Sequence, residues 1–153
     1  MIFEPIHSQN APKAVGPYSP ALQAGDFICL SGQLPIDPST GKMVEGDIRV
    51  QTRQCLKNLE AVLNERGLDL SYIMMVRVYL SDMGDFAGMN EVYAQMFKEP
   101  YPARLCVGVS LLNGAKVEIE AFAMDTRALE VICAGDGCSC CAESDHCEGA
   151  KEK

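Results

Sequence analysis

The fold is decided by the run Ile73–Leu80, which reads IMMVRVYL and lies between two segments with helical patterning. Its apolar and β-branched side chains favour a strand, and Ser81-Asp82 supplies the turn that follows it. Two long helices separated by a strand must pack on one face of a shared sheet, because each helix has one apolar side to bury. The run therefore predicts an α+β fold built on a mixed sheet, with both helices on one face.

The helices on either side of this strand are marked by apolar periodicity and by their end signals. Asp47 can cap the first helix and Gly67 ends it, while Asp82 or Asp85 can cap the second and Pro100 ends it. The apolar positions of the first helix recur with a period near 3.6 at Val50, Cys55, Leu56, Leu59, Val62 and Leu63. Those of the second are Phe86, Met89, Val92, Tyr93, Met96 and Phe97.

Two turn dipeptides place the remaining strands. Gly25-Asp26 separates two apolar runs and predicts a hairpin, and Asn113-Gly114 predicts a tight turn between strands at Leu105–Val109 and Lys116–Met124. The order is then strand-strand-helix-strand-helix-strand-strand. The sheet face opposite the helices needs cover, and a second copy of the chain is the simplest cover. The pattern therefore predicts a homo-oligomer.

Composition limits the classes of function. The 153 residues suffice for one sizeable core, and a net charge of -8 disfavours a nucleic-acid surface, which needs clustered Lys and Arg. No apolar stretch is long enough to span a bilayer, and the first residues lack the pattern of a signal peptide. We therefore expect a cytoplasmic protein whose partner is a small charged metabolite, with no nucleic acid and no membrane involved.

The cysteines divide the chain into a domain at residues 1–127 and an acidic, Cys-rich tail at 128–153. Three single cysteines, Cys29, Cys55 and Cys106, are typical of small buried hydrophobes in a reducing compartment. In the tail, Cys138 and Cys141 form a CxxC close to His146-Cys147. This set could hold one zinc ion, the CxxC could form a redox pair, or the cysteines could belong to a flexible thiol-rich extension, which the Gly residues and low apolar content favour. We assign no metal to the functional site.

The residues that indicate chemistry lie in the last third of the chain. Arg104 follows the rigid pair Pro102-Ala103, and a charged strand with Glu118 and Glu120 comes shortly after it. A guanidinium matches a carboxylate at two points, and a glutamate in the same pocket can hold a water or move a proton. The two glutamates share one face of their strand, because side chains alternate. These residues indicate a site for a small acid, with a solvated ion pair or strand edge as the alternative.

Five short motifs in this order form a recognisable set. They are Gly16-Pro17-Tyr18-Ser19, Ser31-Gly32-Gln33, Asn90, Pro102-Ala103-Arg104 and Val117-Glu118-Ile119-Glu120. Together they resemble the RidA family, also called the YjgF family, over about residues 8–125. One departure is local: Leu112-Asn113-Gly114-Ala115 is one residue shorter than the family's usual segment and lacks its proline. This leaves open whether Glu118 or Glu120 takes the family's catalytic position.

The resemblance implies a fold and an assembly. It implies a six-stranded mixed sheet with two helices packed on one face, similar to chorismate mutase. It also implies a homotrimer in which the sheets form an inner barrel, the helices lie outside, and each active site lies between subunits.

The resemblance also implies roles for individual residues. Arg104 holds the substrate carboxylate, Glu118 orients or deprotonates the attacking water, and Tyr18 closes the pocket from the neighbouring chain. Ser31 and Asn90 bind substrate, although hydroxyl and amide groups at such positions often only satisfy local hydrogen bonds. Cys106 contributes its backbone carbonyl and lines the pocket, since a nucleophilic thiol would need a base nearby.

The activity implied is that of a 2-iminobutanoate/2-iminopropanoate deaminase, which hydrolyses 2-imino or 2-enamino acids to 2-keto acids and ammonia without a cofactor. An alternative is a non-catalytic member that binds a small carboxylic acid as a sensor or regulator. A ribonuclease, the role attached to some members of the family, fits poorly with an acidic chain.

Overall fold

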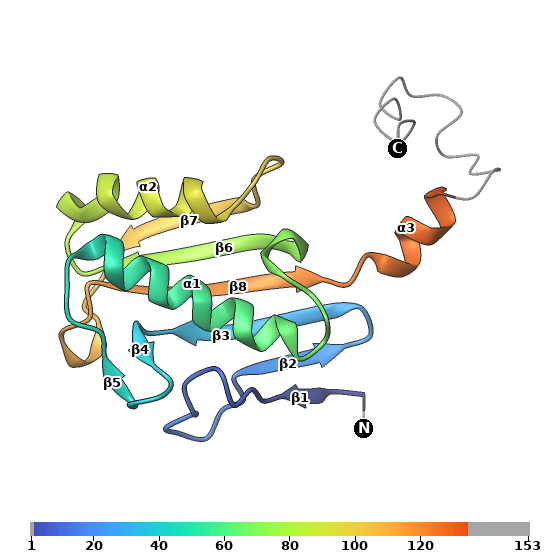
Figure 1. Cartoon of the computed structure of the whole chain (residues 1–153), viewed down its shortest axis with the longest axis horizontal. Helices are drawn as coiled ribbons and strands as arrows, with labels where there is room; N and C mark the ends of the chain where they lie inside the picture. Colours follow the sequence, from blue (N-terminus) through green and yellow to red (C-terminus); the bar gives the residue numbers. More distant parts are fainter. Residues whose placement is uncertain (1, 135–153) are drawn as a thin grey trace.

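The computed structural model describes residues 2–134 and has the predicted α+β architecture, a layer of helices on a layer of sheet (Figure 1). The main sheet has six strands in the order β1-β2-β3-β8-β6-β7. Their bounds are Glu4–Ile6 for β1, Ala21–Ala24 for β2, Phe27–Gln33 for β3, Ile73–Leu80 for β6, Ala103–Gly108 for β7 and Val117–Met124 for β8. The six-stranded mixed sheet expected from the sequence is therefore confirmed.

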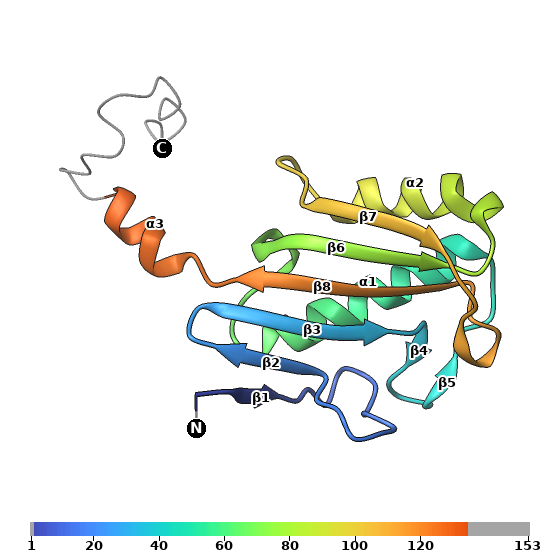
Figure 2. The same ribbon diagram turned by 180° about the vertical axis from the view of Figure 1, so that it is seen from behind.

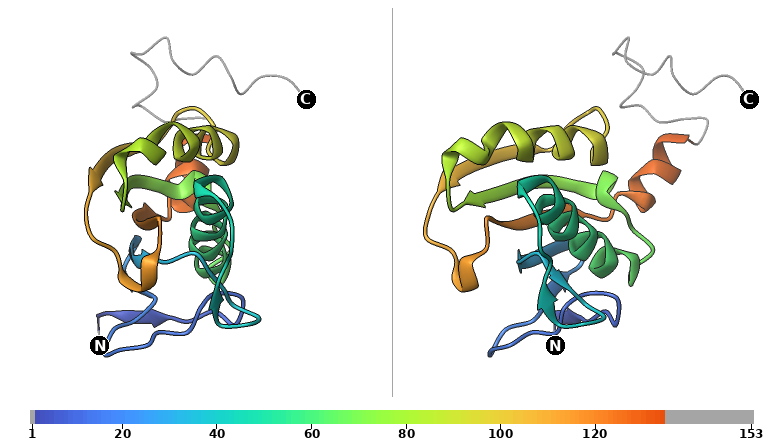
Figure 3. Two further views of the ribbon diagram at one scale, coloured as in Figure 1. Left: turned by 90° about the vertical axis from the view of Figure 1, so that its left-hand side faces the viewer. Right: turned by 60° about the vertical axis from the view of Figure 1, so that its left-hand side comes forward.

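Two helices, α1 at Ile48–Asn64 and α2 at Phe86–Met96, lie on one face of this sheet (Figure 3). The Asp47 carboxylate accepts hydrogen bonds from the backbone N–H groups of Arg49 and Val50, so the predicted cap of α1 is confirmed. At the second helix, Asp85 occupies the N-cap position without a side-chain bond, and Asp82 instead caps the short 3₁₀ helix η2 at Met83–Asp85.

Strand direction explains why both helices share a face. Strand β7 is parallel to β6, and α2 is the crossover between them. Strand β8 is antiparallel to both β3 and β6, so β3 and β6 also run in the same direction and α1 connects them. Parallel strands need crossover connections, and crossovers of one hand place their helices on the same side of the sheet.

The Gly25 turn joins β2 and β3 as the predicted hairpin, with Gly25 at a φ of 59°. The Asn113-Gly114 turn is also present, and both residues have left-handed φ angles, 54° and 72°. It does not close a hairpin, because β6 lies between β7 and β8 in the sheet (Figure 2). The turn belongs to the 3₁₀ helix η3 at Leu112–Gly114, in the connection from the edge strand β7 to the central strand β8.

The two faces of the sheet differ in burial. Alternate residues of β6 and β8, including Val76, Val78 and Ile119, are fully buried beneath the helices. The intervening residues point to the other face, which no helix within residues 2–134 covers (Figure 2). We call this second face the open face. It carries a stacked pair of rings, Phe27 and Phe122, whose centroids lie 5.7 Å apart, and half of the Phe27 side chain is exposed.

Smaller elements complete the described chain. They are a two-stranded sheet of β4 at Ile36–Asp37 and β5 at Lys42–Met43, the 3₁₀ helix η1 at Leu70–Tyr72, and α3 at Arg127–Ala134. Helix α3 spans the predicted boundary between domain and tail and extends away from the sheet (Figure 1). The CxxC and His146-Cys147 lie outside the described residues. Within residues 2–134, no helix is long and apolar enough to cross a membrane.

Candidate functional site

Arg104 lies on the edge strand β7 and points to the helix face of the sheet. It pairs in register with Val76, which is fully buried on that face. Its Nη1 donates a hydrogen bond of 2.9 Å to Asn90 Oδ1 on α2. The Arg104 side chain is exposed, and the described residues provide no carboxylate within ion-pair distance. The other guanidinium donors therefore remain available for an anion.

Two aromatic rings of α2 flank the same guanidinium. Arg104 Cζ lies 4.5 Å from the ring centroid of Tyr93 and 5.7 Å from that of Phe86. Asn90 lies between these residues in sequence, so the three side chains form one stripe on the helix. The Phe86 ring is 38% exposed, whereas Tyr93 is buried. Arg104 and Asn90, two of the predicted site residues, are thus brought together.

Cys106 shares the face of Arg104, as expected from their spacing, and packs partly buried against the core. Burial raises the pKa of its thiol, while the Arg104 charge acts in the opposite direction. A raised pKa keeps the thiol protonated near neutral pH, so Cys106 is a poor nucleophile. Its position fits the predicted role of a lining residue.

The two glutamates of β8 point to the open face, in register with Tyr79 and Arg77 of β6. Glu120 is engaged there: its Oε1 accepts bonds of 2.7 Å from Arg77 Nη1 and 3.1 Å from the Tyr79 hydroxyl. Glu118 lies against the backbone of Gly32. The Cβ atom of any other residue at position 32 would overlap Glu118 Oε1. Of the two carboxylates, Glu118 is therefore the one less engaged by neighbouring side chains.

The environment of Glu118 favours its protonated form more than water does. Burial is the main cause of its raised pKa, and the negative charge of Glu120 adds to it. A carboxylate with a raised pKa is a stronger base than a solvated one, which suits it to accept a proton from a water molecule. Sequence alone left the choice between Glu118 and Glu120 open, and the hydrogen bonds and pKa shift favour Glu118.

Ser31 and Tyr18 lie on the β3 side of the sheet. The Ser31 hydroxyl donates a 2.7 Å bond to the carbonyl oxygen of Ser19, which ties the loop carrying Tyr18 to β3. The Tyr18 side chain is 49% exposed and follows a tight turn in which its N–H bonds the Gly16 carbonyl. Ser31 also borders a cavity of about 350 Å³ that reaches Glu120. Ser31 and Glu118 thus lie on the neighbouring strands β3 and β8, and Tyr18 lies in the loop that the Ser19 carbonyl ties to Ser31.

The predicted residues therefore form two separate groups. We call Arg104, Asn90 and Cys106 the arginine group, and Glu118, Ser31 and Tyr18 the glutamate group. The first lies at the β7 edge on the helix face, and the second lies two strands away, with Glu118 on the open face. Within one protomer, Arg104 therefore lies on the helix face while Glu118 and Glu120 lie on the open face.

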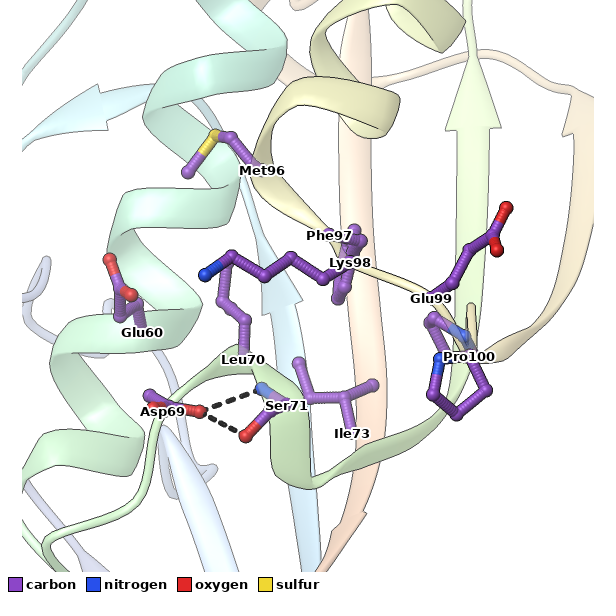
Figure 4. A pocket seen from close by; sticks show the side chains of 11 residues that line it. Glu60, Asp69, Leu70, Ser71, Ile73, Met96, Phe97, Lys98, Glu99 and Pro100 are labelled. Carbon is purple, nitrogen blue, oxygen red and sulfur yellow. Dashed lines mark hydrogen bonds between the residues drawn. The ribbon is translucent and has the colours of Figure 1, made fainter. Parts of the chain in front are cut away.

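A second cavity, of about 280 Å³, lies between the ends of α1 and α2 and contains none of these residues (Figure 4). Leu70 and Ile73 contribute to its apolar lining, and Lys98 extends across it. The Asp69 carboxylate accepts a 2.8 Å bond from the Ser71 N–H and so caps η1. That carboxylate serves the local backbone, and we do not assign the cavity to the functional site.

Sequence reasoning missed the aromatic contacts of Arg104. Phe86 and Tyr93 were expected only as core residues of the second helix, although the spacing of residues 86, 90 and 93 places them on one helical stripe with Asn90. That spacing was the available signal. The pairing of Arg77 with Glu120 was also missed. Alternation places Arg77 on the face opposite its apolar neighbours Val76 and Val78, whereas counting from Ile73 gives the wrong face because the register shifts between Ile73 and Met75. Within residues 2–134, no three His, Cys, Asp or Glu side chains are grouped to hold a metal ion.

Comparisons with known proteins cover the same part of the chain as the sheet and its helices. The profile of the family described as Endoribonuclease L-PSP matches residues 8–125. A RutC family protein of Pyrococcus horikoshii is 54% identical over 121 residues, which make up 78% of this chain and 96% of that protein. The mitochondrial protein mmf1 of Schizosaccharomyces pombe is 44% identical over 122 residues, or 76% of this chain and 74% of that protein.

Solved structures agree with the sequence relatives. A protein of the conserved Rid family, YyfA from Yersinia pestis, superimposes with a TM-score of 0.78 at 42% identity, covering 80% of this chain and 99% of that one. Escherichia coli TdcF, solved with bound serine, gives a TM-score of 0.76 at 40% identity, covering 80% and 98%. From the profile match, the sequence identities and the shared fold, we conclude that this chain belongs to the Endoribonuclease L-PSP family, the family of the RutC and Rid proteins that its sequence motifs indicated.

Proposed function

We propose that the protein hydrolyses 2-enamino and 2-imino acids, such as 2-aminoacrylate and 2-iminopropanoate, to 2-keto acids and ammonia. The observation that carries this proposal is the exposed Arg104 guanidinium, oriented by Asn90 and two rings but with donors left for a ligand. A planar fork of donors in a fixed orientation suits the two oxygens of a carboxylate. The substrate is therefore a small acid whose reactive carbon lies next to its carboxylate.

The reaction is a balanced hydrolysis. An enamine first tautomerises to the imino acid. Water then adds to the carbon of the C=N bond while one of its protons passes through Glu118 to the nitrogen, which gives a neutral tetrahedral carbinolamine. Glu118 next transfers the remaining hydroxyl proton to the nitrogen as the C–N bond breaks, so that ammonia leaves and the oxygen forms the C=O of the 2-keto acid. Holding the imino acid and the water in contact supplies much of the rate enhancement, because the C=N carbon is already electrophilic. Neither an electron nor a further reactant is needed for this balance.

Each complete site is formed by two protomers of a homotrimer. The arginine group and Glu118 of one protomer lie apart, since β6 separates β7 from β8 and Glu118 faces the open side of the sheet. The uncovered open face, with its exposed apolar rings, offers a surface for association with further copies. In a cyclic assembly, the arginine group of one protomer meets the glutamate group of the next.

The family description names a ribonuclease, which this chain fits less well. Its net charge of -8 opposes the approach of a polyanion, whereas a substrate with a single carboxylate can be held by Arg104 alone. The most direct test follows pyruvate formation from enzymatically generated 2-aminoacrylate with and without the purified protein. We expect pyruvate to form faster with the protein. Binding of 2-ketobutyrate without turnover would instead indicate a carboxylate-binding regulator, and RNA cleavage without deamination would also contradict the proposal.

The pH dependence of the reaction tests Glu118. We expect kcat/KM to fall as the pH drops through the raised pKa of Glu118, because the protonated carboxyl cannot accept a proton from water. Glu120→Gln removes the neighbouring negative charge that helps to raise this pKa, so the acid limb should move to lower pH in that variant. Burial, the larger cause, remains, so the shift should be partial. Glu118→Gln should lose most of the activity, and a variant with an unchanged rate would contradict the assignment.

A further inference from the structure

Tyr93 of α2 is the residue whose environment the proposed reaction does not yet explain. Its side chain is only 4% exposed, and its hydroxyl has no hydrogen-bond partner among the described residues. A buried unpaired hydroxyl costs free energy that a phenylalanine would avoid. The ring packs against Phe97 with centroids 4.4 Å apart on one side and lies 4.5 Å from Arg104 Cζ.

We infer that Tyr93 is a positioning residue, whose buried ring holds the Arg104 guanidinium in the orientation that receives the substrate carboxylate. This inference rests on the proposed function and adds a residue to it. Tyr93 does not touch the substrate and acts only through Arg104.

The geometry divides the orientation of Arg104 between two contacts. The bond from Nη1 to Asn90 Oδ1 fixes one corner of the guanidinium, and the ring beneath Cζ limits its remaining movement. A guanidinium stacks favourably on an aromatic face because the face carries negative charge. An exposed arginine otherwise samples many rotamers, and ordering it when the ligand binds weakens the affinity. A pre-oriented Arg104 therefore binds the carboxylate more tightly.

The ring rather than the hydroxyl of Tyr93 performs this role. Burial raises the pKa of Tyr93 to about 12, with the Arg104 charge acting in the opposite direction. The phenol is thus neutral at working pH, and its position beneath the guanidinium keeps it away from the carboxylate side. Phenylalanine keeps the ring and removes only the unpaired hydroxyl, so it is the matched replacement.

The experiment compares steady-state kinetics of Tyr93→Phe and Tyr93→Leu with 2-iminobutanoate as substrate. We expect Tyr93→Phe to keep the original KM, and Tyr93→Leu to raise KM by about three- to thirty-fold, the range expected from loss of one cation–π contact. The kcat of Tyr93→Leu should change little, because carboxylate binding contributes equally to the ground state and the transition state. Tyr72→Leu removes a tyrosine that packs against the core without contacting Arg104, and its KM should not change.

The possible outcomes separate this inference from the proposed function. If Tyr93 were only a core residue, Tyr93→Leu would reduce the active fraction, so kcat would fall while KM stayed constant. An unchanged KM in Tyr93→Leu, with Arg104→Ala strongly impaired, overturns the inference alone. If Arg104→Ala retains full turnover, the proposed function fails as well. Should Tyr93→Leu not fold, Tyr93→Met fills the space without an aromatic face. A raised KM in Tyr93→Met then supports the inference, and an unchanged KM overturns it.

Discussion

Arg104→Ala should lower kcat/KM for 2-aminoacrylate by about a hundredfold to ten-thousandfold, because two charge-assisted hydrogen bonds to the substrate carboxylate are lost together. The folded structure should tolerate the change, since the Arg104 side chain is exposed and makes no ion pair within residues 2–134. The measurement is the initial rate of pyruvate formation over a range of substrate concentrations, together with thermal unfolding of both proteins.

Two controls make this result specific. Arg104→Lys keeps the positive charge but loses the two-point geometry, so its activity should lie between those of the original protein and Arg104→Ala. Arg53→Ala removes an exposed arginine of α1 that bonds Gln95, and its kinetics should not change. A similar loss in Arg53→Ala would indicate a general charge effect. Full activity in Arg104→Ala would mean that the carboxylate binds elsewhere.

Two inactive variants should recover activity when they are assembled together. Arg104→Ala retains an intact glutamate group, and Glu118→Gln retains an intact arginine group. If each site takes one group from each of two neighbouring protomers, a mixed trimer contains one interface with both groups intact. Random mixing in equal amounts should restore about a quarter of the original activity, since about three quarters of the trimers are mixed and each has one complete site of three.

The recovery experiment uses proteins unfolded together in urea and refolded as a mixture. Each variant refolded alone should stay inactive, and the double variant Arg104→Ala/Glu118→Gln mixed with either single variant should give no recovery. Sites formed within one protomer would also give no recovery from the mixture of single variants, because no chain carries both groups. That outcome would contradict the two-protomer site directly.

Much of the fold follows from local patterns. The 3.6 period from Asp47 to Gly67 predicted α1, and the apolar run of Ile73–Leu80 predicted β6 with the bounds that the structure gives. Both depend on interactions between residues near in sequence or on burial of one face, which a single sequence records. The order of strands across the sheet was not predicted in this way, because strand pairing joins distant residues. The turn at Asn113 thus gave no sign that β6 separates β7 from β8.

For the site as well, the sequence predicted some features, and others depended on strand pairing between distant residues. Motif resemblance identified Arg104, Glu118 and their companions, but sequence spacing suggested that the two side chains share a pocket. Whether they do depends on which face each strand presents, and each strand has its own register against its neighbours. Arg104 pairs with buried Val76, whereas Glu118 pairs with Tyr79 on the open face. Tyr93 escaped notice because a buried tyrosine on an apolar helix face has the pattern of an ordinary core residue.

The central place of β8 has a consequence for how the chain folds during synthesis. This strand comes after every other strand in sequence, yet it joins β3 on one side to β6 on the other. Until Val117–Met124 has left the ribosome, β3 and β6 each expose an unpaired edge, and such edges are prone to pair with other chains. The late strand completes the sheet in one long-range step, so the facing edges of β3 and β6 gain their partner only when that strand is in place.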